Sequence, residues 1–136
     1  MVKKTTATTY TYAIGRRKSA IATVKLYSGK GDTRVNTVAV DKYFPTPSEK
    51  NIYEKPFLVT NTTDKFYYKA KIIGGGKNGQ IKSLVLALSR ALQKLDNTLT
   101  SVLRTNGLLT VDSRVRERRM VGTGGKARRQ KQSPKR

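Results

Sequence analysis

The stretch GQIKSLVLALSRALQKLD, from Gly79 to Asp96, decides the fold of this chain because it predicts its longest element. Its apolar side chains recur at helical spacing and form one stripe, made of Ile81, Leu84, Leu88, Ala91, Leu92 and Leu95. Lysine, serine and glutamine side chains lie away from that stripe. An amphipathic helix of this kind gains most of its stability from an apolar surface that it covers, which other segments must supply.

The segment directly before this helix, Lys65–Ile73, is predicted to be a strand because apolar and polar residues alternate along it. One face is predicted to pack on an apolar layer and consists of Phe66, Tyr68, Ala70 and Ile72. The opposite face consists of Lys65, Tyr67, Lys69 and Lys71. Its lysines therefore face solvent or phosphate.

Three further segments are predicted to be strands: Ala20–Tyr27, Thr33–Val40 and Pro56–Asn61. The residues SGKGD between the first two supply the Gly and Asp of a tight connection, so these two strands are predicted to form a hairpin.

Two shorter helices are also predicted. Thr46, Pro47 and Glu49 fit the N-cap, the first turn and the capping-box partner of a short helix over the edge of the sheet. Thr98 fits the N-cap of a second helix, which ends at Asn106–Gly107. Helices and strands in this order predict an α+β domain.

The apolar residues, 36 % of the chain, concentrate between Tyr10 and Val111, which indicates one globular domain over residues 10–113. Residues 1–9 contain no apolar core of signal-peptide length and are interpreted as a basic N-terminal extension, with a transit peptide as the alternative. Residues 114–136 carry ten basic side chains and one acidic one, Glu117, and are interpreted as an extended basic tail.

The charge of the chain indicates a polyanionic partner. Lys and Arg number 29 against 8 acidic residues, which gives a net charge of +21. No stretch approaches the apolar length of a membrane span, and the basic regions are not amphipathic helices with bulky apolar faces. Nucleic acid is therefore the expected partner, rather than a membrane or a small-molecule substrate.

Catalysis and cofactor binding are not expected. The chain lacks Cys and His, which removes thiolate nucleophiles, disulfides and nearly every transition-metal site. In GGGKNGQ (Gly74–Gln80), Gln80 and Ile81 stand where a phosphate-binding loop requires Lys and Ser or Thr. The acidic residues lie beside turn and cap signals, so we expect no catalytic residue, no metal and no cofactor.

Two other motifs predict phosphate contacts. GRRKSAIA sets Arg16, Arg17 and Lys18 directly before a strand, beside a glycine that lets the backbone approach closely. The glycine loop with Lys77 fits either a seat for an RNA phosphate or a turn that needs positive φ, and the two readings are compatible.

The end of the chain, RRQKQSPKR, can bury almost nothing, so something outside the protein must hold it. Gly122, Gly124, Gly125 and Pro134 interrupt the cations, which suits a chain that threads among phosphates better than a helix in a groove. Extended, the fifteen residues from Gly122 reach about 50 Å.

These motifs together resemble the bacterial and organellar small-subunit ribosomal protein nine family over nearly the whole chain, from Tyr12 to Arg136. The resemblance is carried by GRRKSAIATVKL, VN followed by DKYFP, GGGKNGQ, ALSRAL, LRTNGLLTVDSRVRERRMVG and KARRQ…KR. It implies two layers, a sheet of about four strands with packed helices and a left-handed crossover, as in the second domain of small-subunit ribosomal protein five.

The resemblance also implies a function and its partners. The family lies in the head of the small subunit, on the 3′ domain of its rRNA, beside other head proteins. Its tail approaches the tRNA in the peptidyl site. The expected place is the cytoplasmic ribosome of a bacterium, with a plastid or mitochondrial ribosome as the alternative.

The site residues follow from the motifs and the resemblance. The expected rRNA contacts are Arg16, Arg17, Lys18, Lys69, Lys71, Lys77, Arg114, Arg116, Arg118, Arg119, Lys126, Arg128, Arg129 and Lys131. The expected tRNA contacts are Lys135 and Arg136. The family commonly ends Gln-Phe-Ser-Lys-Arg, whereas Ser133 and Pro134 stand before the last two residues here, so a stacking contact from the tail is not expected to be kept.

Two other functions use some of the same features. A free nucleoid-type protein would use the cations on duplex DNA, and co-sedimentation with small subunits separates it from a ribosomal protein. A metabolite-kinase-like enzyme would share a related fold, but the interrupted phosphate-loop spacing and the lack of a plausible base disfavour it.

Overall fold

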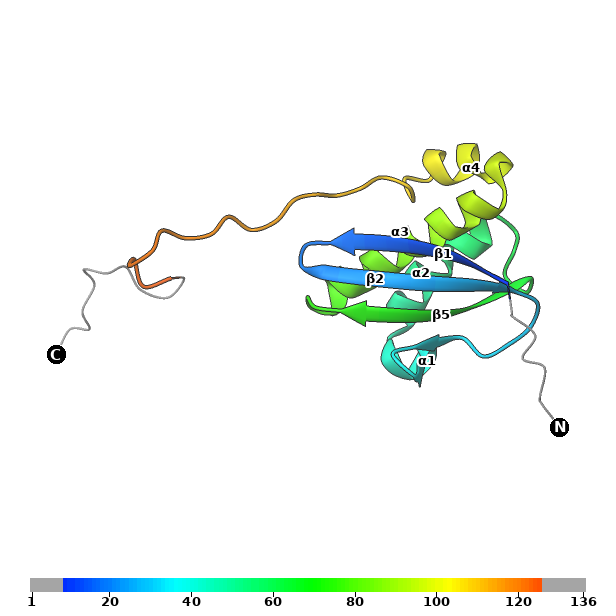
Figure 1. The fold of residues 1–136 in the computed structure, drawn as a ribbon, viewed down its shortest axis with the longest axis horizontal. Helices are drawn as coiled ribbons and strands as arrows, with labels where there is room; N and C mark the ends of the chain where they lie inside the picture. The colour runs from blue at the N-terminus through cyan, green and yellow to red at the C-terminus, as the bar shows by residue number, and fades with distance from the viewer. Residues whose placement is uncertain (1–8, 126–136) are drawn as a thin grey trace.

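The computed structural model describes residues 9–125 and shows an α+β fold of two layers (Figure 1). Its strands are β1 (Tyr10–Arg17), β2 (Ala20–Ser28), β3 (Arg34–Val35), β4 (Val38–Ala39) and β5 (Phe66–Ile73). Its helices are α1 (Val40–Tyr43), α2 (Pro47–Val59), α3 (Lys77–Leu95) and α4 (Thr100–Thr105), with a 3₁₀ turn, η1, at Asn97–Leu99. The predicted N-terminal extension lies outside the described residues except for Thr9.

The five strands form one mixed sheet in the order β1-β2-β5-β3-β4. β2 pairs antiparallel with both β1 and β5, whereas β3 pairs parallel with β5. The parallel pair requires a crossover, which runs through β4, α1 and α2. Helices α2 and α3 lie behind the sheet in Figure 1, so one face of the sheet is covered and the other is open.

The predicted hairpin between Ala20–Tyr27 and Thr33–Val40 is wrong. β2 pairs instead with β5 and with β1, a strand that the sequence analysis missed. The second segment divides into β3, a two-residue turn at Asn36–Thr37, β4 and the first residue of α1. β2 is buried on one face along its length, so the best partners are the long strands on either side rather than a two-residue one.

The predicted strand at Pro56–Asn61 is also wrong, because Pro56–Val59 is the last turn of α2. The predicted start of this helix is confirmed: the Glu49 carboxylate accepts a hydrogen bond from the backbone N–H of Thr46 at 3.3 Å. Phe57 is buried in the core, and α2 packs on α3. Burial in the tertiary structure therefore keeps this apolar segment helical, although its residues favour strands.

The predicted strand over Lys65–Ile73 and the predicted long helix are confirmed as β5 and α3. In β5 the buried residues are Tyr68, Ala70 and Ile72, and Lys69 and Lys71 point to the open face. Helix α3 begins at Lys77, with Gly76 as its N-cap. The helical stripe is buried except at its last residue, but the placement of serine away from the buried side is wrong. Residues 83–89 are all buried, and the Ser89 hydroxyl donates to the carbonyl of Val85 at 2.8 Å.

The turn that follows α3 does not have the predicted N-cap. The Asp96 carboxylate, rather than Thr98, caps η1 by accepting a hydrogen bond from the backbone N–H of Thr98 at 2.9 Å.

Helix α3 packs unusually close to β1 because small residues line the contact. Gly15 faces the helix, where a Cβ would overlap the carbonyl oxygen of Ser83 and lie 2.6 Å from the nitrogen of Ala87. The same helix closes the outer edge of β1: Arg90 donates to the carbonyl of Ile14 and Lys94 to that of Tyr12, both at 2.8 Å.

This contact predicts that Gly15→Ala destabilises the protein by about 2–3 kcal/mol, because the added methyl group meets helix backbone that cannot move aside. Gly79→Ala in α3 is the matched control, since its Cβ would lie at an ordinary 3.4 Å from the carbonyl oxygen of Arg17. The control should be neutral or stabilise the helix by up to about 1 kcal/mol. Thermal unfolding followed by circular dichroism measures both, and equal stabilities would contradict the close packing.

Candidate nucleic-acid interface

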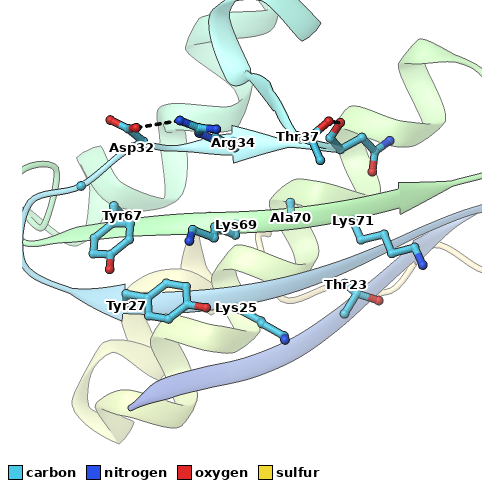
Figure 2. Close-up of a pocket in the computed structure, with 12 residues that line it drawn as sticks. Thr23, Lys25, Tyr27, Asp32, Arg34, Thr37, Tyr67, Lys69, Ala70 and Lys71 are labelled. Atoms are coloured by element: carbon cyan, nitrogen blue, oxygen red, sulfur yellow. Dashed lines mark hydrogen bonds and ion pairs between the residues drawn. The ribbon is translucent and has the colours of Figure 1, made fainter. Parts of the chain in front are cut away.

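The open face of the sheet carries two rows of side chains that run across the strands (Figure 2). The register places Tyr10 opposite Tyr27, and Tyr27 opposite Tyr67, which forms a tyrosine row. Two residues further along each strand, Lys25 lies opposite Lys69, and Lys69 lies opposite Arg34 of β3, which forms a cation row. The predicted contacts Lys69 and Lys71 both point to this face.

The tyrosine row is packed in a fixed arrangement. The rings of Tyr27 and Tyr67 are stacked, with centroids 5.0 Å apart and an angle of 12° between planes. The ring of Tyr10 lies 5.7 Å from that of Tyr27, tilted by 53°. Lys25 and Lys69 reach back over this row, with their ammonium nitrogens 4.8 Å from the Tyr10 ring and 5.7 Å from the Tyr27 ring. Aromatic and basic groups thus form one surface.

Asn36 holds β3 against β5 and so brings Arg34 to the cation row. Its side-chain NH₂ donates to the carbonyl of Ile72 at 2.9 Å, and its side-chain oxygen accepts from the N–H of Ile72 at 2.8 Å. Its own backbone N–H donates to the carbonyl of Ala70 at 2.9 Å. Arg34 also pairs with Asp32, its guanidinium nitrogen 2.9 Å from the carboxylate.

The three adjacent cations at the end of β1 do not form one site. Arg16 is exposed on the open face, and Arg17 turns to the helix side of the sheet. Lys18 occupies the β1–β2 turn with a positive φ of 54°. Strand alternation therefore separates side chains that the sequence analysis grouped together.

The glycine loop packs on this turn. Gly74 and Gly75 have positive φ, which confirms the turn reading, and a Cβ on Gly75 would lie 2.8 Å from Cβ of Ala20. Lys18 and the first residues of α3 line a small depression beside the loop. Lys77 is directed elsewhere: its Nζ donates to the carbonyl of Tyr43 at 2.6 Å and lies 4.4 Å from that ring. The phosphate seat itself remains a prediction.

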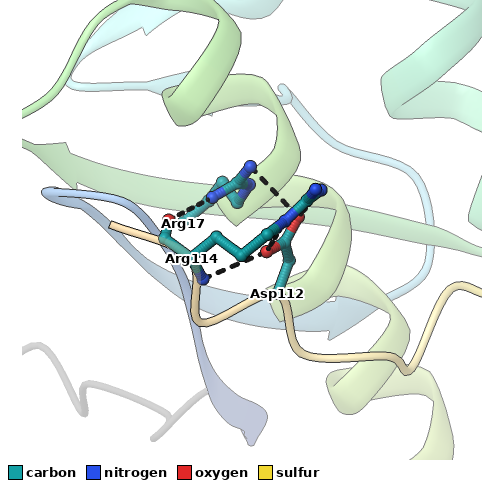
Figure 3. A network of polar contacts seen from close by, with 3 residues as sticks. All are labelled: Arg17, Asp112 and Arg114. Atoms are coloured by element: carbon teal, nitrogen blue, oxygen red, sulfur yellow. Dashed lines mark hydrogen bonds and ion pairs between the residues drawn. The ribbon is translucent and has the colours of Figure 1, made fainter. Parts of the chain in front are cut away.

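Arg17 anchors the root of the tail (Figure 3). Its guanidinium lies 3.0 Å from the Asp112 carboxylate and donates to the carbonyl of Arg114 at 2.8 Å. The Arg17 side chain is only 11 % exposed, so most of its surface is used within the protein. Arg17 thus holds the root of the tail, and its predicted contact with rRNA stays a prediction.

Asp112 is the centre of this contact, because it also accepts hydrogen bonds from the guanidinium and backbone N–H of Arg114. These bonds, together with the positive charges of Arg114 and Arg17, hold the pKa of Asp112 well below its ordinary value. Arg114, a predicted rRNA contact, leaves most of its side chain exposed while making this pair.

From Val115 to Gly125 the chain extends away from the domain without regular secondary structure (Figure 1). Arg116, Arg118 and Arg119 are exposed along it. The apolar side chains there are exposed too, Met120 at 80 % and Val121 at 83 %. The remaining predicted tail contacts lie outside the described residues: Lys126, Arg128, Arg129, Lys131, Lys135 and Arg136.

The sequence analysis missed part of the open face. Lys25 and Arg34 were not identified as contacts, nor were Tyr10, Tyr27 and Tyr67. Alternation in AIATVKLY did place Lys25 and Tyr27 on the face opposite the apolar residues. Their alignment with Lys69 and Tyr67 depends on pairing between distant strands, for which one sequence carries no local signal.

The described residues 9–125 hold no group of three or more acidic side chains that could bind a metal ion. Over the same range, none of the helices has the length and hydropathy needed to cross a membrane.

The chain is similar to known proteins over most of its length. A family model described as ribosomal protein S9/S16 matches residues 15–136. A small ribosomal subunit protein uS9 from Dehalococcoides mccartyi is 41 % identical over 122 residues, 90 % of each chain. The protein of the same name from Methylacidiphilum infernorum is 46 % identical over 117 residues, 86 % of each chain. That from Maridesulfovibrio salexigens is 41 % identical over 116 residues, which cover 85 % of this chain and 89 % of the relative.

The root of the tail is expected to loosen in acid. Because the folded-state pKa of Asp112 is lowered, its contacts should persist above its ordinary pKa of about 3.9 and be lost as the pH falls further. A spin label on Val115→Cys reports the motion of this segment, and the chain has no other cysteine. The label should therefore keep its slow motion at about pH 4 and move faster only well below it, as the pH approaches the lowered folded-state pKa.

In the Asp112→Asn variant the label should already move faster at neutral pH, and its motion should no longer change as the pH falls. The same label on Lys30→Cys, in the β2–β3 connection, is the control and should respond to neither change. Identical spectra for Asp112→Asn and the parent chain would show that Asp112 does not hold the tail.

Proposed function

The chain belongs to the ribosomal protein S9/S16 family, and from this premise we propose that it is a structural component of the small ribosomal subunit. The relatives described above bear the name of a small-subunit protein and come from bacteria, which supports a ribosome of bacterial type. Such a component acts by binding RNA and neighbouring proteins rather than by catalysis.

The observation that carries this proposal is the described part of the tail. Arg116, Arg118 and Arg119 are exposed, and within residues 9–125 none of them forms an ion pair. A segment that is fixed at its root by Arg17 and extends with unneutralised arginines is suited to phosphates outside the protein. We take the rRNA of the subunit head as the polyanion that binds it.

The globular domain supplies the other rRNA contacts of the proposal. Arg16 and Lys18 lie at the end of the sheet next to the glycine loop, and Lys69 and Lys71 lie on its open face. Lys77 lies beside the same loop, but its ammonium already bonds Tyr43, so its role is to position α1 and its phosphate contact is secondary. Neighbouring head proteins are proposed to cover other parts of the surface.

The end of the tail is proposed to touch the tRNA in the peptidyl site. Lys135 and Arg136 form a charged pair at the last two positions, and the segment from Gly122 can span about 50 Å when extended. Arg128 and Arg129 would bind rRNA on the way. The proposed place of action is therefore the decoding region of a bacterial cytoplasmic ribosome.

Removing the residues after Gly125 should leave the domain able to enter small subunits but weaken tRNA binding to the peptidyl site. The loss should appear as a higher Mg²⁺ requirement in a filter-binding titration, because Mg²⁺ can replace the missing cations on phosphate. Lys135→Ala with Arg136→Ala should show a smaller shift in the same direction.

The matched control is Lys3→Ala with Lys4→Ala, which removes the same charge from the other end of the chain. It should bind tRNA like the parent. The tRNA contact would be refuted by subunits that carry the deletion and bind tRNA normally at every Mg²⁺ concentration. Failure of the parent chain itself to enter small subunits would refute the ribosomal role.

A further inference from the structure

The cation row is an unfavourable arrangement in the protein alone. Lys25 and Lys69 are opposite each other on adjacent antiparallel strands, and Arg34 is opposite Lys69 on the parallel side. Neighbouring strands lie only about 4.8 Å apart, and like charges that face one another across a sheet are destabilising. Within the described residues, Arg34 has an acidic partner, Asp32, whereas Lys25 and Lys69 have none. A chain of negative charges laid along the row would remove this repulsion.

The tyrosine row lies beside the cation row at a spacing that suits a polynucleotide. The two rows are separated by two residues along each strand, about 6.6 Å. The rings are held by their neighbours: Tyr67 stacks on Tyr27 and also packs against Gly31, where a Cβ would come within 2.9 Å of the ring. Tyr10, at the outer end, is 46 % exposed and offers ring surface to a ligand. Phosphates can follow one row while bases reach the other.

The shape of the surface favours unpaired RNA over a duplex. Both rows, except Tyr10, line a groove with a volume of about 1040 Å³ over β2, β5 and the segment from Gly31 to Thr37. A paired A-form helix presents phosphates and 2′-hydroxyls while its bases stack on one another, so aromatic rings gain little from it. Unpaired bases stack on aromatic side chains, and a sheet face that combines aromatic and basic residues is suited to them.

We propose that the open face of the sheet binds an unpaired stretch of ribosomal RNA that crosses the strands. Its phosphates follow Lys25, Lys69 and Arg34, and a base stacks on the exposed ring of Tyr10, which the packed rings of Tyr27 and Tyr67 support. This inference rests on the proposed function, since it names the form of RNA that the domain holds. It adds a second binding surface, on the domain itself, to the contacts of the tail.

The first test removes charge from the cation row of the full-length chain. Lys25→Gln with Lys69→Gln should bind a short labelled oligouridylate several-fold more weakly than the parent, in fluorescence anisotropy. The slope of affinity against salt should fall by about 1.4, or about 0.7 for each lost phosphate contact on a single strand. The same variant without RNA should melt about 1–4 °C higher, because the repulsion across the strands is gone.

The matched control is Lys50→Gln with Lys55→Gln, two exposed lysines of α2 on the other layer. It loses the same charge but should keep the affinity and slope close to those of the parent, and it should not melt at a higher temperature. A fully paired RNA hairpin of equal length is the second probe, and on it the row variant and the control should behave alike.

The second test removes a ring without changing charge. Tyr10→Leu should weaken oligouridylate binding by about fivefold to a hundredfold, the effect of losing one base–aromatic stack, with an unchanged salt slope. Tyr10→Phe keeps the ring and should bind like the parent. Tyr27→Leu removes the ring that supports Tyr10 and should weaken binding in the same direction.

The inference is overturned if the row variant loses no more affinity than the α2 control, or if it loses as much on the hairpin as on the single strand. It is also overturned if both leucine variants bind like the parent. These outcomes leave the ribosomal role intact, because that role is judged by entry of the parent chain into small subunits.

Discussion

The contact between α3 and the β1–β2 pair is the constraint on which the rest of the molecule depends. Small residues on both sides, Gly15 facing Ala87 above all, let the helix lie almost on the strand backbone. The buried hydrophobic cluster thereby lies on one side of the sheet. The other side carries the exposed tyrosines and the basic side chains of the strands, so a chain with an excess of positive charge presents part of that charge as an ordered surface.

Sequence periodicity correctly predicted the helix and the strand that carry a regular apolar pattern. Strand β5 keeps one period over its length, and helix α3 keeps its apolar stripe as far as Leu92 although residues 83–89 are all buried; both elements are found where these patterns predict. β1 was missed because its inward positions are Ala13, Gly15 and Arg17, which carry no hydrophobic alternation. PFLVTN was assigned to a strand because its composition is β-prone, whereas a helix start ten residues earlier and burial against α3 decide its conformation. Strand partners depend on contacts between distant residues and could not be read locally.

The candidate interface was predicted by charge but not by geometry. The tail and the lysines of β5 follow from composition and alternation alone. Arg16 and Arg17 are adjacent cations in the sequence, but a strand places consecutive side chains on opposite faces. Only the structure shows which acidic residue pairs with Arg17. That acid, Asp112, is far from Arg17 in sequence and was interpreted as an ordinary turn residue. The alignment of lysine with lysine across β2 and β5 likewise depends on register, which sequence does not state.

The two edges of the sheet affect how the protein behaves before it binds RNA. At one border, arginine and lysine side chains from α3 already occupy carbonyls of β1, and at the other the terminal strand is only two residues long. Neither border offers a foreign strand a continuous ladder of free donors and acceptors. Newly made copies of the chain are therefore protected against aggregation by strand pairing at the sheet edges. Their high positive charge also makes them repel one another.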